Sequence, residues 1–197
     1  MKTVAFRRTL PAATAVLTGL ALVVAAQGAP AASKRSTTAR ITGGHATDPR
    51  DGGRPVVLIA AALGVPTEVF RAAFSAVTPA GAGEEPDPEQ VRLNKEALLK
   101  VLAPYGVTNE RLDEVSNYYR YNASAGEVWR QTTATARAVV RNGKVVSVRI
   151  VRAGAGYSST PRVALVGYPK VKVRATVAYG TDLATNGRIA KLTLVKG

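Results

Sequence analysis

Residues 134–151 read ATARAVVRNGKVVSVRIV, and this stretch decides the fold of the last third of the chain. On both sides of Asn142-Gly143, apolar and polar residues alternate with the period of two that is typical of a strand with one buried face. Asn-Gly tolerates the positive φ angles that a type I′ turn requires. The stretch therefore predicts an antiparallel β-hairpin.

A second hairpin is predicted at the end of the chain. Residues 173–177 read VRATV, and residues 188–195 read RIAKLTLV after a second Asn-Gly at Asn186-Gly187. Between the hairpins, Pro161 begins another predicted strand over residues 162–166, at a position where its missing N–H is tolerated. We expect an antiparallel β module of about five strands.

Upstream of the hairpins, the apolar residues recur with the period of helices. Residues 56–63 form an apolar run ended by Gly64, Asp87 precedes Pro88 in a typical helix start, and Thr108 is an N-cap candidate. These signals predict four helices before residue 127.

The helices read as a duplication, because Leu63-Gly64-Val65 and Tyr105-Gly106-Val107 stand at matching places in two helical pairs. Each pair is an αα-hairpin too small to bury its own apolar stripe, so we expect the two to pack as one small helical cluster. The predicted fold class is α+β, a helical cluster followed by the β module.

The first residues predict export. Lys2, Arg7 and Arg8 precede an apolar stretch that ends in small residues, as in a signal peptide, and the export route, general secretory or twin-arginine, stays open. We expect a secreted or periplasmic protein without an integral membrane segment after signal cleavage, since no second long apolar run follows. The expected parts are a signal peptide over 1–32, a flexible leader over 33–53, a helical domain over 54–127 and a basic β domain over 128–197.

The 197 residues include no cysteine and one histidine, His45. This excludes disulfides, thiolate nucleophiles and Cys-type or multi-His metal sites, so we predict no cofactor and no metal site. His45 is close in sequence to Asp48 and Asp51, a combination suited to acid–base catalysis or metal binding. Catalytic groups must be held rigidly, however, and these three fall in the expected leader, so we predict no catalytic residue.

Basic residues concentrate at the end of the chain. Residues 33–127 hold 11 Lys+Arg and 12 acidic residues, whereas residues 128–197 hold 13 Lys+Arg and one acidic residue. Period-two alternation puts several of these cations on one sheet face. The candidate binding residues are Lys170, Lys172, Arg174, Arg149 and Lys191.

Two interpretations of these cations remain. They form either a solvated outer face whose lysines protect an exposed edge, or a contact surface for an anionic partner. The excess of positive over negative residues favours the contact surface, because like charges on neighbouring strands destabilise a sheet unless a partner balances them. The predicted partner is an anionic polymer or surface: an envelope polyanion, an acidic polysaccharide, a lipid headgroup surface or extracellular nucleic acid. Cytoplasmic DNA is not expected for an exported chain.

A family resemblance supports a noncatalytic role. Residues 142–150, NGKVVSVRI, and 154–163, GAGYSSTPRV, resemble the Gly-x-Gly-Tyr-(Ser/Thr)-x-x-Pro β-repeat of phage tail-fibre and bacterial surface proteins. The match covers roughly residues 134–166. The chain also resembles uncharacterised exported bacterial proteins that join such a repeat to a short helical segment. The resemblance implies a structural or binding element and brings no catalytic residue with it.

An aromatic cluster precedes the β module. Tyr118, Tyr119 and Tyr121 lie shortly before Trp129, a grouping typical of a seam between packed parts or of a carbohydrate-stacking platform, with the seam favoured.

These observations predict an exported, noncatalytic binding or scaffolding protein of the cell envelope or extracellular space. The alternative is an extracytoplasmic hydrolase with an acidic site between the two halves, built from acids within residues 110–127. A third alternative is an oligomer that assembles through exposed strand edges.

Overall fold

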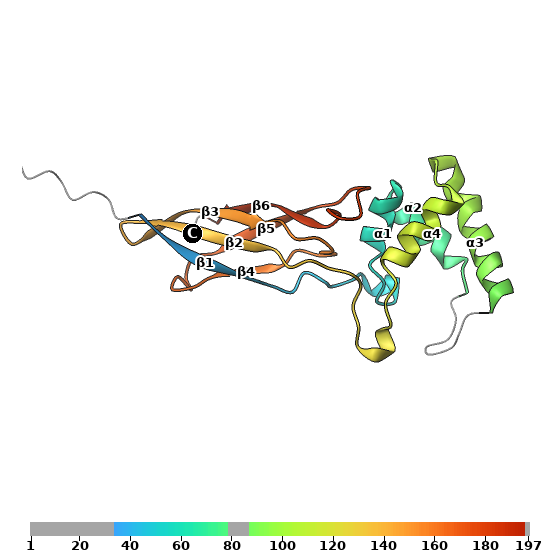
Figure 1. Cartoon of the computed structure of the whole chain (residues 1–197), viewed down its shortest axis with the longest axis horizontal. Coiled ribbons are helices and arrows are strands. Elements are labelled where there is room, and N and C mark those ends of the chain that lie inside the picture. The colour runs from blue at the N-terminus through green and yellow to red at the C-terminus, as the bar shows by residue number, and fades with distance from the viewer. Residues whose placement is uncertain (1–33, 79–86, 196–197) are drawn as a thin grey trace, which may run out of the picture. The chain divides into compact units, whose positions relative to one another are not determined.

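The computed structural model describes residues 34–78 and 87–195. The predicted signal peptide, residues 1–32, lies outside these ranges. The described chain contains four α-helices and a six-stranded antiparallel sheet, which confirms the predicted α+β class (Figure 1).

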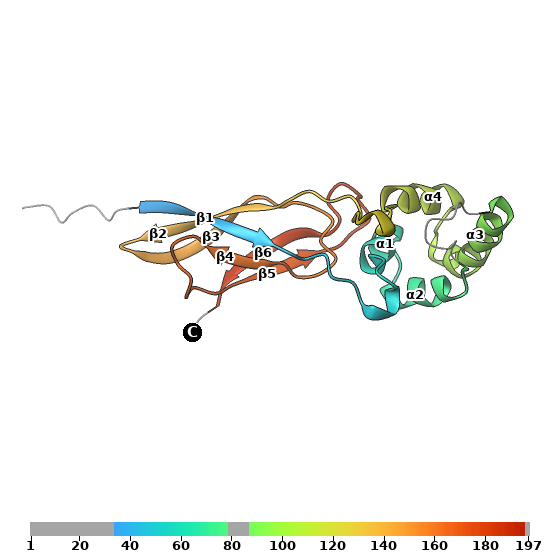
Figure 2. The ribbon, with the colours of Figure 1, turned by 90° about the horizontal axis from the view of Figure 1, so that it is seen from below.

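The sheet curls almost into a barrel (Figure 2). Its strands lie in the order β3-β2-β1-β4-β5-β6, and each is antiparallel to its neighbours. The outer strands β3 and β6 approach each other, and the N–H of Ile189 donates to the carbonyl of Ala153 at 2.9 Å. The strands are β1 (Lys34–Thr42), β2 (Thr135–Arg141), β3 (Lys144–Arg152), β4 (Arg162–Leu165), β5 (Val173–Ala178) and β6 (Arg188–Leu194).

Both predicted hairpins are confirmed. Asn142 and Gly143 join β2 to β3 with φ angles of 48° and 75°, as a type I′ turn requires. β5 pairs with β6 across the connection that ends in Asn186-Gly187. The inner face of the sheet buries small and branched side chains, among them Ala138 and Ile189.

The expectation of a flexible leader over residues 33–53 is wrong, whereas the five predicted strands are present as β2 to β6, and β1 adds a sixth strand to them. β1 lies in the middle of the sheet, paired with β2 on one side and β4 on the other. Its sequence, KRSTTARIT, has few apolar residues because its outward face meets solvent, while Ala39 and Ile41 point inward. A strand with one solvated face needs only an alternate set of small or apolar side chains, and Thr is itself a good strand former.

The helical part contains α1 (Val56–Leu63), α2 (Thr67–Ser75), α3 (Pro88–Leu102) and α4 (Asn109–Tyr118), with short 3₁₀ turns at Pro49–Asp51, Ala103–Tyr105 and Ala123–Ala125. The predicted caps are present: Asp87 accepts from the N–H of Glu89, and Thr108 accepts from the N–H of Arg111. The duplication is visible in the two Gly-Val turns. Gly64 and Gly106 are left-handed, with φ of 74° and 83°, and the valine after each is buried in one helical core.

Asn186 joins the sheet to the helices. This buried side chain donates from Nδ2 to the carbonyl of Leu58 in α1 (2.7 Å) and to the Tyr119 hydroxyl just after α4 (2.8 Å). Its Oδ1 accepts from the N–H of Gly180 (3.1 Å). All three hydrogen bonds of this amide go to other groups of the protein. The Asn186 side chain therefore fixes the β5–β6 connection against two helices.

We expect Ala39→Asp to lower the free energy of unfolding by about 3 kcal/mol or more, because it buries an unpaired charge in a central strand. Urea unfolding of residues 33–197 measures the change. Thr38→Asp is the matched control, since the neighbouring side chain faces solvent. Equal stability of the two variants would mean that this segment is not part of the folded sheet.

We expect Asn186→Ala to cost about 3 kcal/mol of unfolding free energy, because it leaves the Leu58 carbonyl, the Tyr119 hydroxyl and the Gly180 N–H without their partner. The same urea titration measures it. Asn142→Gly, which keeps a left-handed turn residue at an exposed position, should change stability by less than about 1 kcal/mol. A similarly small loss in Asn186→Ala would show that the junction does not depend on this amide.

Candidate functional site

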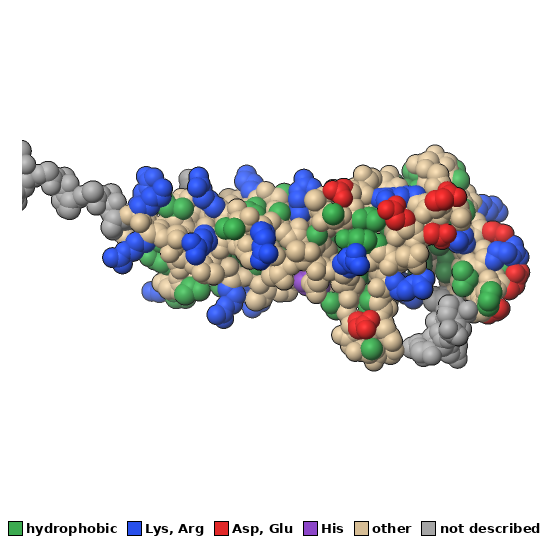
Figure 3. Space-filling model, viewed as in Figure 1, with side chains coloured by type: hydrophobic (Ala, Val, Ile, Leu, Met, Phe, Trp, Pro, Cys, Tyr) green, Lys and Arg blue, Asp and Glu red, His purple; other side chains and the backbone are tan. Residues whose placement is uncertain are grey.

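Every strand of the sheet carries at least one exposed lysine or arginine, and residues 128–197 contain a single acid, Asp182. Figure 3 shows Lys and Arg side chains spread over the strands, whereas Asp and Glu gather over the helices. Within residues 34–78 and 87–195, all ion pairs belong to Arg50, Arg71, Arg92, Lys95 and Arg111. The described cations of the sheet therefore have no carboxylate partner.

The strand register places like charges directly opposite each other on the outer face. Arg137 of β2 stands opposite Arg149 of β3, and at the hairpin end Arg141 stands opposite both Lys34 of β1 and Lys144 of β3. Directly opposed side chains of neighbouring strands are roughly 5 Å apart at Cβ, close enough for like charges to destabilise the sheet. An anion lying over this surface would remove that repulsion.

The sequence prediction missed this part of the surface. Lys34 and Arg40 lie on β1, which was expected to be a flexible leader, and the pairing of Arg137 with Arg149 follows only from the register. The Asn142-Gly143 turn alone would set Arg137 opposite Val148. The register shift between Val139 and Val140 brings Arg149 there instead, and the sequence pattern gave no signal for that shift.

The five predicted cations are all exposed, but they are distributed around the curved sheet. Arg149 lies on β3, Lys191 on β6 opposite Thr176, and Arg174 on β5. Lys170 and Lys172 lie in the β4–β5 connection just before β5, rather than within a strand. The structure brings Lys172 and Arg174 together, in a groove that they share with Arg162 of β4.

This groove has a volume of about 710 Å³ and runs along β4 and β5. Among the described residues, the two strands share one register pair, Val163 with Val173. Continuing that register sets Pro161 opposite Ala175, and proline has no N–H to donate. The ladder therefore stops, and apolar side chains of the two strands line the groove beside the three cations.

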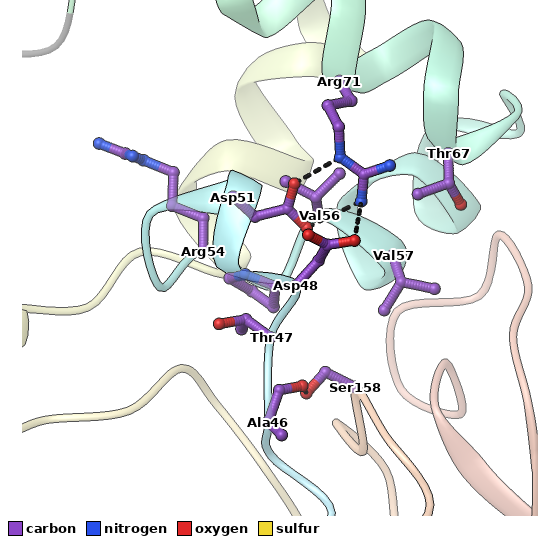
Figure 4. A pocket seen from close by; sticks show the side chains of 11 residues that line it. Ala46, Thr47, Asp48, Asp51, Arg54, Val56, Val57, Thr67, Arg71 and Ser158 are labelled. Atoms are coloured by element: carbon purple, nitrogen blue, oxygen red, sulfur yellow. Dashed lines mark hydrogen bonds and ion pairs between the residues drawn. The ribbon is translucent and has the colours of Figure 1, made fainter.

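A smaller pocket of about 220 Å³ contains the two aspartates singled out in the sequence (Figure 4). Arg71 of α2 points toward both: its Nε and Nη2 donate to the Asp51 carboxylate at 2.6 and 3.0 Å, and Nη2 lies 3.7 Å from Asp48. Hydrogen bonds from Arg50 hold the pKa of the Asp48 carboxyl well below its usual range. Bonds to Asp51 and Glu68 raise the pKa of Arg71. Both carboxylates are thus bound by arginine side chains.

His45 is held rigidly, which corrects the expectation that it lies in a flexible leader. Its ring stacks on Tyr157 at 5.2 Å and lies 6.1 Å from the Trp129 ring. Burial lowers the pKa of His45, against a smaller opposite effect of the Gln131 hydrogen bond. In the described residues its Nε2 is buried without a hydrogen-bond partner, and the carboxylates of Asp48 and Asp51 bond to arginines instead. Among the described residues, no hydrogen bond joins His45 to either carboxylate.

The aromatic cluster lies at the seam between helices and sheet. Trp129 is buried and donates from Nε1 to the carbonyl of Gly156 at 2.9 Å. The Tyr121 hydroxyl donates to the carbonyl of Gly53 at 2.8 Å. Burial raises the pKa of Tyr119, which contacts Asn186, to about 12. These rings are used for packing, as a seam requires.

Acids within residues 110–127 lie on the helical part. Asp113 pairs with Lys95 at 2.8 Å, Glu114 with Arg111 at 2.5 Å, and Glu127 accepts from the N–H of Asn122. In the described ranges there is no group of three or more His, Asp or Glu residues placed to hold a metal ion.

No single helix in the described residues is long and apolar enough to span a membrane; α1 and α2 meet that criterion only as a pair bent by 109°. Comparisons with protein-family models, with curated proteins and with solved structures found no match.

We expect Arg149→Glu to raise the free energy of unfolding by about 0.5–1 kcal/mol at low salt, because the new carboxylate faces Arg137. Urea unfolding at low salt and in about 1 M NaCl measures the gain, which salt should remove. Arg152→Glu is the matched control, since Arg152 stands opposite Thr135. An equal gain in the control would mean that only net charge matters, not the opposed pair.

Proposed function

We propose that this chain is an exported, noncatalytic binding or scaffolding protein of the cell envelope or extracellular space, whose cationic outer sheet surface binds an anionic polymer or surface. The observation that carries the proposal is the opposition of Arg137 and Arg149, with Lys34, Arg141 and Lys144 at the same outer face, in a sheet whose described cations have no acidic partner.

Charge imbalance of this kind costs stability unless a ligand balances it. The helical part shows the ordinary solution, because Arg92 pairs with Glu89 and Glu96 on the surface of α3. The outer sheet surface contains no such pairs in the described residues. A polyanion supplies many negative charges on one chain and can follow a curved surface, which suits cations that are spread over neighbouring strands.

The hydrolase alternative has no comparable support. Among the described pockets, those with acidic residues contain carboxylates paired to arginine or lysine, and none combines acids of residues 110–127 with the sheet. The function that we propose is therefore noncatalytic.

The test is retention of residues 33–197 on immobilised dextran sulfate, with elution by increasing NaCl. We expect Arg137→Gln combined with Arg149→Gln to weaken binding roughly tenfold and to lower the salt concentration of elution, since two charges of the contact surface are lost. Lys100→Gln combined with Arg120→Gln removes two exposed charges from the helical part and is the matched control. Equal weakening in the control, or elution of the unmodified chain at low salt, would contradict the proposal.

A further inference from the structure

We propose that the groove between β4 and β5 binds an anionic phospholipid, with the phosphate between Arg162 and Arg174 and the acyl chain on the apolar floor formed by Val163, Val173 and Val195. This inference deepens the proposed function, on which it rests, by naming the ligand class of one part of the cationic surface.

The cations of the groove converge because of the strand register. Val163 pairs with Val173, and the exposed neighbours of this pair, Arg162 and Arg174, both line the groove. Lys172, two residues before Arg174, points to the same exposed side and lines the same groove. Three cations without an ion-pair partner in the described residues thus surround one space. Two guanidiniums and an ammonium form a set of donors suited to a phosphate group.

The floor of the groove is apolar because the ladder between β4 and β5 stops after one pair. Val163 and Val173 are side chains of the inner face, yet both line the groove. Val195, held beside β5 by a 2.9 Å bond from its N–H to the carbonyl of Lys172, adds an apolar side chain that is 41% exposed. The volume of about 710 Å³ lies in the range typical of small-molecule sites.

Charge and apolar surface together select the ligand. A polysaccharide or nucleic acid would use the arginines and leave the valines in contact with water, whereas a neutral apolar molecule would leave three cations unpaired beside it. An anionic amphiphile satisfies both parts of the groove at once, since its headgroup meets the cations and its hydrocarbon covers the floor.

The experiment measures sedimentation of residues 33–197 with phosphatidylcholine vesicles, with or without about one third phosphatidylglycerol. We expect binding only to the vesicles that contain phosphatidylglycerol. Arg162→Gln combined with Arg174→Gln should weaken this binding about 30-fold, from two basic residues at an anionic lipid surface. Lys100→Gln combined with Arg120→Gln, which removes two exposed charges from the helical part, should weaken it by less than about threefold. Circular dichroism establishes that each variant is folded.

A competition experiment distinguishes binding of the whole lipid from binding of its headgroup alone. Lysophosphatidylglycerol should displace the protein from the vesicles. Glycerol phosphate at the same concentration should not, because it lacks the hydrocarbon that the apolar floor of the groove contacts. Equal competition by the two molecules, equal weakening by the groove variant and the helical control variant, or equal binding to both kinds of vesicle would each overturn the lipid proposal. Strong retention on dextran sulfate together with one of these results would leave the polyanion proposal standing, so the two failures are distinguishable.

Discussion

The amide of Asn186 is the interaction on which the arrangement of the described chain depends. It is almost fully buried and joins three separate segments: the carbonyl of Leu58, the hydroxyl of Tyr119 and the N–H of Gly180. The next residue, Gly187, allows this contact, because a Cβ there would lie 2.7 Å from Leu58 and 2.8 Å from the backbone of Tyr157. Burying one polar side chain with all its partners satisfied specifies one geometry where an apolar contact would allow several.

Local patterns predicted most elements because they depend on neighbouring residues. Turns and helix caps could be predicted because each requires particular side chains at fixed spacing. They are the Asn142-Gly143 turn, the Asp87 and Thr108 caps and the two Gly-Val turns. β1 was missed because Ser, Thr and Arg on a solvated strand face resemble a linker in composition, and only its partners β2 and β4 show that it is central. The rigid position of His45 was missed for the same reason.

The candidate surface could be predicted only in part. The excess of Lys and Arg after residue 128 is a property of the sequence, and the exposure of Lys170, Lys172, Arg174, Arg149 and Lys191 agrees with the alternation. The opposition of Arg137 and Arg149 depends on register, and the β4–β5 groove depends on where a ladder stops. Both are properties of strand pairs. The alternation of polar and apolar residues predicted one cationic face on a single side of the sheet. A sheet that curls on itself instead distributes its outward side chains around a closed surface.

The central position of β1 also sets the order in which the chain can fold. Lys34 pairs with Arg141 and Ala39 with Leu165, so the first described strand must wait until residues more than a hundred positions later have been synthesised. Contacts this distant in sequence make the closing of a sheet slow. Until they form, the edges of β2 and β4 that face β1 are unpaired, and the six strands cannot join into one sheet.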